Sequence, residues 1–324
     1  MKKYISILVI SMLMLCTLTA CGKKDDSVGK NGDSLSIVTT IFPEYDWVMN
    51  ILGSDNKNAE VTLLLDNGVD LHSYQPTAAD ILKISTCDVF IYVGGESDEW
   101  VEDVLETADN KDMVVVNLLE TLGELVKEEE MVEGMQGEEE GEEEEIEYDE
   151  HVWLSLKNAG LLVEGISEAL KSADPDNASK YADNAAKYVE KLNALDKQYE
   201  EAVASASFDT LLFGDRFPFR YMVDDYGLSY YAAFVGCSAE TEASFETITF
   251  LAGKVDELGL KSVMTIEGAD KSIAETIIAN TADKDAKVLT MDSLQSVTKK
   301  DVESGASYLS IMENNLSVLK EALK

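Results

Sequence analysis

The sequence contains two histidines, and the positions of both suggest chemistry. His72 follows the apolar segment 59–66, and His151 follows the apolar segment 112–120 and a run of glutamates. If both segments are parallel strands, both histidines lie past carboxyl ends of strands in one sheet. Imidazole is the commonest ligand for borderline divalent metals. The placement therefore points to a shared metal site, and the alternative is two unrelated surface histidines.

Two aspartates have comparable positions in the second half of the chain. Asp215 ends the apolar segment 209–214, and Asp292 follows the apolar segment 286–291. An aspartate at the end of a strand is often only a helix cap, so neither is decisive alone. Joined to two imidazoles, they would complete a set of two nitrogens and at least two oxygens. That set suits zinc or manganese and is too rich in nitrogen for calcium or magnesium.

The segments that must position these residues alternate between strand and helix patterns, which indicates parallel sheets with helical crossovers. Strands are expected at residues 34–42, 59–66, 87–95, 112–120, 209–215, 228–234, 260–268 and 286–292. We therefore predict an α/β fold with two lobes, at residues 35–155 and 207–324. Each lobe is a mostly parallel sheet flanked by helices, and ligands bind between the lobes.

Residues 156–206 are predicted to be linking helices. Apolar residues recur at steps of three and four over the second of them, from Tyr181 to Val203. A helix from Pro175 to about Ala204 would be roughly 45 Å long at 1.5 Å per residue. That length would connect both lobes as one backbone helix. The competing interpretation is a coiled-coil seam, but we expect a monomer.

The N-terminus has the pattern of an export signal. Lys2 and Lys3 precede an apolar run that ends in Leu-Thr-Ala-Cys at Cys21. This resembles a bacterial lipobox, so we predict a signal peptide at 1–20, a lipid on Cys21 and a flexible tether at 21–34. An uncut signal anchor is the alternative. The mature protein is expected outside the cytoplasmic membrane, held by its lipid anchor.

The net charge of −37 excludes a nucleic-acid partner and a folded face on anionic lipid, and it favours cations. Residues 128–150 carry much of this charge and few large apolar side chains. We predict an exposed, mobile acidic loop there. Cys16 would leave with the signal. Cys87 and Cys237, far apart in sequence, are interpreted as small buried apolar residues.

These residues stand in motifs that resemble a known family. The segment "DNGVDLHSYQPT" is similar to a Gly-x-Asp-x-His-x-Tyr-x-Pro motif, and "DEHVWLS" to an Asp-Pro-His-x-Trp-Leu motif. "IVTTIFPEYDWVMNILG", "TIEGADKSIAETIIA" and "LTMDSL" continue the likeness in order. The chain resembles the lipoproteins that bind zinc or manganese for ABC importers. The resemblance covers nearly all of the mature chain.

The resemblance implies that His72, His151 and Asp292 are metal ligands in the cleft between lobes. The family's third ligand is His or Glu, whereas Arg216 stands at that place, and arginine cannot bind a cation. The substitutes are Asp215, Glu240, Glu242 or water. Alternatively, Arg216 pairs with a cleft carboxylate.

The expected function is capture of a divalent metal and its delivery to an ABC importer permease, without enzymatic turnover. Zinc is the expected metal and manganese the alternative. The glutamate-rich loop would raise the local metal concentration, or it has no role. A zinc hydrolase is disfavoured because no His-Glu-x-x-His motif is present. A metal-binding adhesion or sensing lipoprotein remains a further alternative.

Overall fold

Two four-stranded parallel sheets organise the computed structural model, which describes residues 34–137, 147–238 and 242–324. Their strand orders are β2-β1-β3-β4 and β6-β5-β7-β8. The strands are β1 Leu35–Thr39, β2 Ala59–Leu63, β3 Val89–Tyr92, β4 Val114–Asn117, β5 Thr210–Phe217, β6 Ser229–Val235, β7 Ser262–Ile266 and β8 Lys287–Met291. We call the first sheet with its helices the N-terminal lobe and the second the C-terminal lobe. The prediction of two parallel α/β lobes is confirmed.

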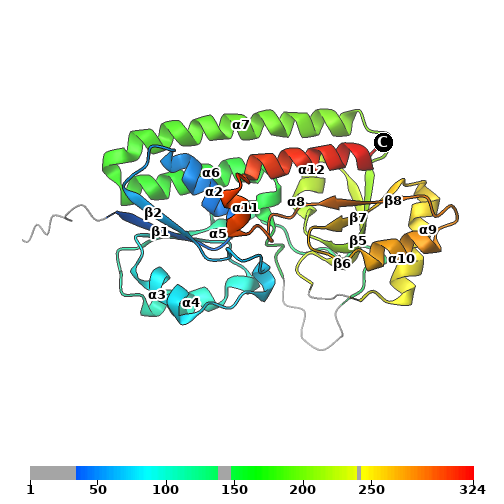
Figure 1. Cartoon of the computed structure of the whole chain (residues 1–324), viewed down its shortest axis with the longest axis horizontal. Coiled ribbons are helices and arrows are strands. Elements are labelled where there is room, and N and C mark those ends of the chain that lie inside the picture. The colour runs from blue at the N-terminus through cyan, green and yellow to red at the C-terminus, as the bar shows by residue number, and fades with distance from the viewer. Residues whose placement is uncertain (1–33, 138–146, 239–241) are drawn as a thin grey trace, which may run out of the picture. The chain divides into compact units, whose positions relative to one another are not determined.

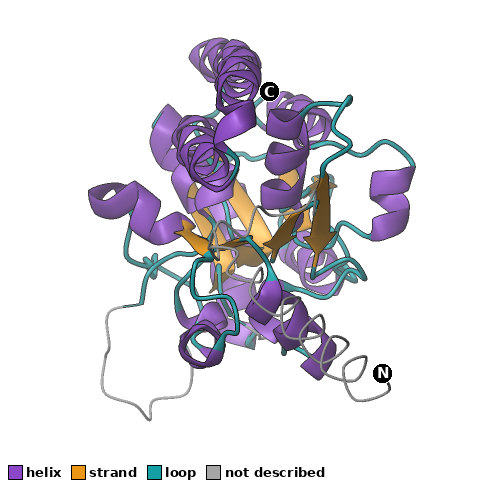
Figure 2. Cartoon of the chain, turned by 90° about the vertical axis from the view of Figure 1, so that its left-hand side faces the viewer, coloured by secondary structure: helices purple, strands orange, loops and turns teal. Residues whose placement is uncertain are grey.

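Helices lie on both sides of the strands, as Figure 2 shows. They are α2 Phe42–Leu52, α3 Ala78–Thr86, α4 Trp100–Thr107, α5 Leu118–Leu122, α6 Leu156–Ala173, α7 Ala178–Ala204, α8 Arg220–Tyr226, α9 Phe245–Leu258, α10 Ser272–Asn280, α11 Lys299–Glu303 and α12 Tyr308–Ala322. A short 3-10 helix at Leu71–Ser73 contains His72, and another at Val152–Leu154 directly follows His151. Within the described ranges, no helix is both long enough and apolar enough to cross a bilayer.

The predicted long helix is present as α7, which runs past both sheets in Figure 1. Its 27 residues give it a length of about 40 Å. A 3-10 turn at Pro175–Asn177 precedes it, because proline fits the first turn of a helix. The predicted stripe faces the core, with these buried members: Tyr181, Ala185, Tyr188, Leu192, Leu195 and Tyr199.

The C-terminal helix α12 also joins the lobes. It packs against α7 and against α2 of the N-terminal lobe, although the sequence predicted it as part of the C-terminal lobe alone. The Tyr308 hydroxyl donates to the carbonyl oxygen of Trp153 at 2.6 Å, and the rings of Tyr308 and Trp47 lie 5.2 Å apart. The main hydrophobic core is continuous through both lobes. The seam between the lobes is therefore supported by shared packing.

The acidic segment differs from its prediction at both ends. Glu128 and Tyr148 form an antiparallel bridge, and Glu130 pairs with Arg220 of α8 at 2.6 Å. Asp149 and Glu150 are buried, so the prediction of an exposed loop is wrong for them. Hydrogen bonds inside the protein replace water for Oδ1 of Asp149 and Oε1 of Glu150, as shown below. Residues 138–146, the predicted signal and tether, and Cys21 lie outside the described residues.

Candidate metal centre

His72 is held by the turn that follows β2. The Asp70 carboxylate accepts a hydrogen bond from the His72 backbone N–H at 3.0 Å and so caps the 3-10 helix that contains the histidine. The Nδ1 atom of His72 lies 2.8 Å from the Ser97 hydroxyl and 3.5 Å from Oε2 of Glu150. These partners leave Nε2 of His72 pointing into the seam.

His151 is completely buried beside the end of the acidic segment. Oδ1 of Asp149 accepts from the His151 backbone N–H at 2.8 Å and lies 2.9 Å from Nδ1. A carboxylate only accepts hydrogen bonds, so Nδ1 carries a proton, and in the neutral imidazole the lone pair is then at Nε2. The Tyr221 hydroxyl donates to the carbonyl oxygen of Asp149 at 2.8 Å and fixes that residue from the C-terminal lobe. A carboxylate behind an imidazole is the usual support of a metal ligand.

The two imidazole rings meet edge to edge. The Nε2 atoms of His72 and His151 are 3.1 Å apart. Two lone pairs at this distance repel, so a proton or a cation must lie between them. Burial, followed by the charge of His151, lowers the pKa of His72 to about 3, so His72 is neutral at neutral pH. Neutral imidazole is the form that binds metals.

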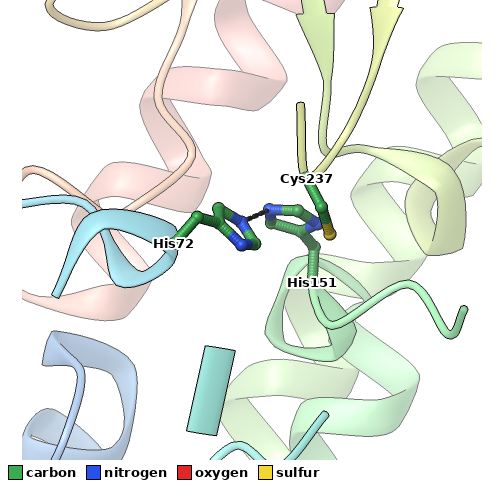
Figure 3. A group of neighbouring side chains, drawn as sticks. All are labelled: His72, His151 and Cys237. Atoms are coloured by element: carbon green, nitrogen blue, oxygen red, sulfur yellow. Dashed lines mark hydrogen bonds between the residues drawn. The ribbon is translucent and has the colours of Figure 1, made fainter. Parts of the chain in front are cut away.

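Cys237 is the third member of this group. Its Sγ and one ring nitrogen of each histidine all lie within 4.8 Å of one another, and Figure 3 shows the three side chains together. Burial, with the charge of Glu129, raises the pKa of the thiol well above its usual value. Sequence reasoning missed this residue by interpreting it as apolar packing. Its position just after β6, at the carboxyl end of a strand, was the available signal.

A cavity of about 250 Å³ adjoins His72 and Cys237. Carboxylates dominate its lining, which comprises His72, Glu96, Ser97, Glu129, Glu147, Tyr148, Glu150 and Cys237. The Oε1 atom of Glu150 accepts from the Ser97 backbone N–H at 2.9 Å. Its Oε2 is buried and has no hydrogen-bond partner among the described residues. The negative lining makes the cavity attractive to cations.

Asp215 is used differently from the prediction. Its Oδ1 accepts from the Arg216 backbone N–H at 2.9 Å, and its Oδ2 accepts from the Ile266 N–H at 3.0 Å. The second of these bonds connects β5 to β7, the first lies within β5, and burial raises the pKa of this carboxyl. Asp215 does not belong to the group of His72, His151 and Cys237. Its role as a metal ligand stays a prediction.

Asp292 follows β8, as expected, but it also lies outside that group. Its Oδ1 accepts from the Leu294 N–H at 2.8 Å, and its backbone is held by the Asn315 amide at 2.9 and 2.7 Å. Burial, followed by the charge of Asp292, raises the pKa of neighbouring Glu267 to about 7. Asp292 as a ligand also stays a prediction.

Arg216 pairs with Asp70, so the ion pair connects the C-terminal lobe to the motif that contains His72. Burial raises the pKa of Asp70, but the Arg216 guanidinium outweighs it and the net pKa is lowered. This is the pairing with a cleft carboxylate that the sequence left open. Glu240 lies outside the described residues, and the Glu242 carbonyl accepts from the Gln136 amide at 3.5 Å.

The fold and this centre define a class: a two-lobed α/β binding protein with two histidines and a cysteine grouped at the seam between its lobes. The chain belongs to the ZnuA family, described as zinc-uptake complex component A, periplasmic, which it matches over residues 37–322. It is 35% identical to the zinc-binding lipoprotein AdcA of Streptococcus pneumoniae, over 99% of this chain and 61% of that protein. The chain thus spans about three fifths of the length of the first curated relatives it matches.

A full-length likeness is also found. The high-affinity zinc uptake system protein ZnuA of Bacillus subtilis is 29% identical, over 99% of this chain and 98% of that protein. Among solved structures, the zinc-bound ZnuA-like domain of Streptococcus pneumoniae AdcA superposes with a TM-score of 0.70 and 31% identity. That comparison covers 90% of this chain and 99% of the domain.

Proposed function

We propose that the protein captures a zinc ion at the seam between its lobes and delivers it to the permease of an ABC importer. The observation that carries this proposal is the pair of Nε2 atoms 3.1 Å apart, with the Nδ1 of His151 tied to Asp149. In a tetrahedral zinc site with Zn–N distances of about 2.05 Å, two nitrogens lie about 3.3 Å apart. The facing imidazoles are therefore close to the spacing of zinc ligands.

Capture requires that the proton between the rings leave. The Nδ1 proton of His151 is engaged in the hydrogen bond to Asp149. The proton between the rings therefore resides on Nε2 of His72. When zinc binds, His72 must present a lone pair at Nε2 and carry its proton on Nδ1. Nδ1 of His72 then faces the Ser97 hydroxyl and, at 3.5 Å, Oε2 of Glu150. This Oε2 atom has no other hydrogen-bond donor among the described residues. Glu150 thereby stabilises the zinc-binding tautomer.

Zinc is preferred over manganese because imidazole nitrogens are borderline-soft donors, and zinc forms more stable complexes with such donors than manganese does. The names of the relatives support the same cargo. Coordination without turnover fits this arrangement, and release to a permease fits the family's description as an uptake component. We further propose that Cys21 carries a lipid that holds the protein outside the cytoplasmic membrane, as a monomer.

Competition titration of the purified chain with a chromophoric zinc chelator tests the proposal. We expect a single zinc ion per chain, displaced by manganese only at large excess. His151→Ala should abolish binding, while Lys83→Ala, an exposed change in α3, should not affect it. Zinc binding that is unchanged in His151→Ala would contradict the proposed site. In cells, Cys21→Ser should move the protein from the membrane fraction to the medium or periplasm.

A further inference from the structure

We propose that Cys237 binds the captured ion directly as a thiolate, so that the cargo site has a His₂Cys donor set. The inference rests on the proposed function, because it concerns the ligands of the same site. It also sharpens the class of cargo. A thiolate is a soft ligand that favours zinc and cadmium and disfavours manganese, which prefers oxygen.

The geometry brings three donor atoms from three separate segments to one point. Nε2 of His72 comes from the loop after β2, Nε2 of His151 from the end of the acidic segment, and Sγ of Cys237 from the loop after β6. The two Nε2 atoms are 3.1 Å apart, and Sγ lies within 4.8 Å of one ring nitrogen of each histidine. In a zinc site the nitrogen-to-sulfur separation is about 3.6 Å, from bonds of about 2.05 and 2.3 Å. The thiol side chain adjusts to this separation when the ion binds.

The backbone of the loop is built to hold the thiol there. Gly236 lies against the His151 ring, where an added Cβ would be 3.1 Å from Cε1 and 3.0 Å from the carbonyl oxygen of Phe217. A side chain at residue 236 would push the loop and its sulfur away from the histidines. On the other side, Oε1 of Glu129 accepts from the Cys237 N–H at 2.9 Å. Cys237 is thus fixed between a glycine contact and a hydrogen bond.

The second thiol of the described residues shows what a packing cysteine looks like in this fold. Cys87 is buried at the end of α3, and its Sγ donates to the Ile84 carbonyl at 3.2 Å. No histidine is grouped with it among the described residues. Cys87 therefore provides a matched control: it has the same chemistry in the same chain, away from the centre.

Cobalt(II) substitution of the full chain tests the thiolate, because sulfur bound to cobalt has a near-ultraviolet charge-transfer band that nitrogen and oxygen ligands lack. We expect this band in the wild-type protein and in Cys87→Ser, and its loss in Cys237→Ser. Zinc affinity should fall at least about 10-fold in Cys237→Ser, since changes in supporting residues alone have effects of 10- to 100-fold. Cadmium affinity should fall more than zinc affinity, and manganese affinity should not fall.

Two results separate the failures. If the wild-type chain binds zinc but its cobalt form lacks the band, and Cys237→Ser keeps full zinc affinity, the thiolate is refuted and the proposed function stands. If the wild-type chain binds no zinc, the proposed function and the thiolate fail together. Cys237→Ala gives a second variant without the oxygen of serine. Equal thermal stability of the ion-free variants shows that a lost band is not lost folding.

Discussion

The rims of the two lobes meet at the seam and carry similar residue types, yet their carboxylates do different work. On the N-terminal lobe, Asp149 and Glu150 direct their oxygens at the imidazoles of His151 and His72. On the C-terminal lobe, both carboxylate oxygens of Asp215 accept hydrogen bonds from backbone N–H groups. A position at the end of a strand therefore does not by itself leave a carboxylate oxygen free for an ion. What matters is whether a carboxylate oxygen or ring nitrogen remains available after the backbone N–H groups nearby have formed their hydrogen bonds.

The same contrast applies to rigidity. The histidine rim is held by side chains from both lobes, including the Tyr221 hydroxyl on Asp149 and the Trp153 indole N–H, which donates to the Ser293 carbonyl at 2.9 Å. The main core continues through the seam. The two imidazoles are thus held in place by the fold itself, and under the proposed function this reduces the reorganisation needed for binding.

The largest expected effect is on the histidine rim itself. His72→Ala should weaken zinc binding at least about 100-fold, because it removes a donor atom and not just its support. Asp215→Asn, the matched change on the opposite rim, should alter affinity by less than about 3-fold, because this carboxylate is engaged by the backbone. Chelator competition measures both. Comparable losses of zinc affinity in the two variants would show that the carboxylate of Asp215 contributes to binding as much as His72 does.

A smaller effect on zinc affinity is expected for Asp149, which contacts His151 on the side away from His72. Asp149→Asn replaces an acceptor by an amide that can present N–H to Nδ1 of His151, so the imidazole no longer favours its metal-binding tautomer. Zinc affinity should fall about 10- to 100-fold with little change in thermal stability. Titration of the variant beside Asp149→Glu, which keeps the carboxylate, separates charge from shape. Full affinity in Asp149→Asn would show that Asp149 does not orient the ligand.

The ion pair that joins the rims should affect stability. Arg216→Gln leaves the partly buried Asp70 carboxylate without its partner and should lower the free energy of unfolding by about 2 kcal/mol. Denaturant unfolding of the ion-free chain measures this. The double variant Asp70→Asn/Arg216→Gln should recover part of the loss, since no unpaired charge remains. Additive losses in the double-mutant cycle would mean that the two side chains do not interact.

The pH dependence of stability tests a buried carboxyl on the histidine rim. Burial, with a contribution from Glu150, raises the pKa of Asp98 to about 7 from the ordinary value of 3.8. The folded state therefore binds more protons than the unfolded state between these pH values. Asp98 should make stability fall as pH rises through this window, by up to roughly 1.4 kcal/mol per pH unit.

Asp98→Asn is the matching variant because an amide keeps an acceptor for the Gly94 N–H, which donates to Oδ2 of Asp98 at 3.0 Å. Unfolding of the ion-free wild-type and variant chains from pH 4 to pH 7 should show a smaller decline in the variant. Parallel curves would mean that Asp98 is ionised throughout the window in the folded protein.

Much of the fold could be predicted because its signals are local. Apolar segments separated by helix patterns predicted both sheets, and the stripe from Tyr181 to Tyr199 predicted α7. The common rim of His72 and His151 followed from strand direction alone. The packing of α12 on α2 could not be predicted, because it depends on the relative placement of two lobes.

Other features of the centre depend on tertiary structure. Asp149 and Glu150 belong to an acidic run, and only the fold shows that Asp149 contacts His151 and that the Ser97 N–H donates to Glu150 inside the protein. Cys237 lies 86 residues beyond His151 in the chain, and its spacing matches no metal motif. Only the parallel order of β5 and β6 brings it back to the seam.

The central claim is that one ion is held between the two imidazoles at the seam. Anomalous diffraction at the zinc edge, from crystals grown with zinc and no chelator, tests it most directly. We predict one strong peak within bonding distance of Nε2 of both His72 and His151, on the side where Cys237 lies. A zinc peak elsewhere, with no ion between these two Nε2 atoms, would contradict the account.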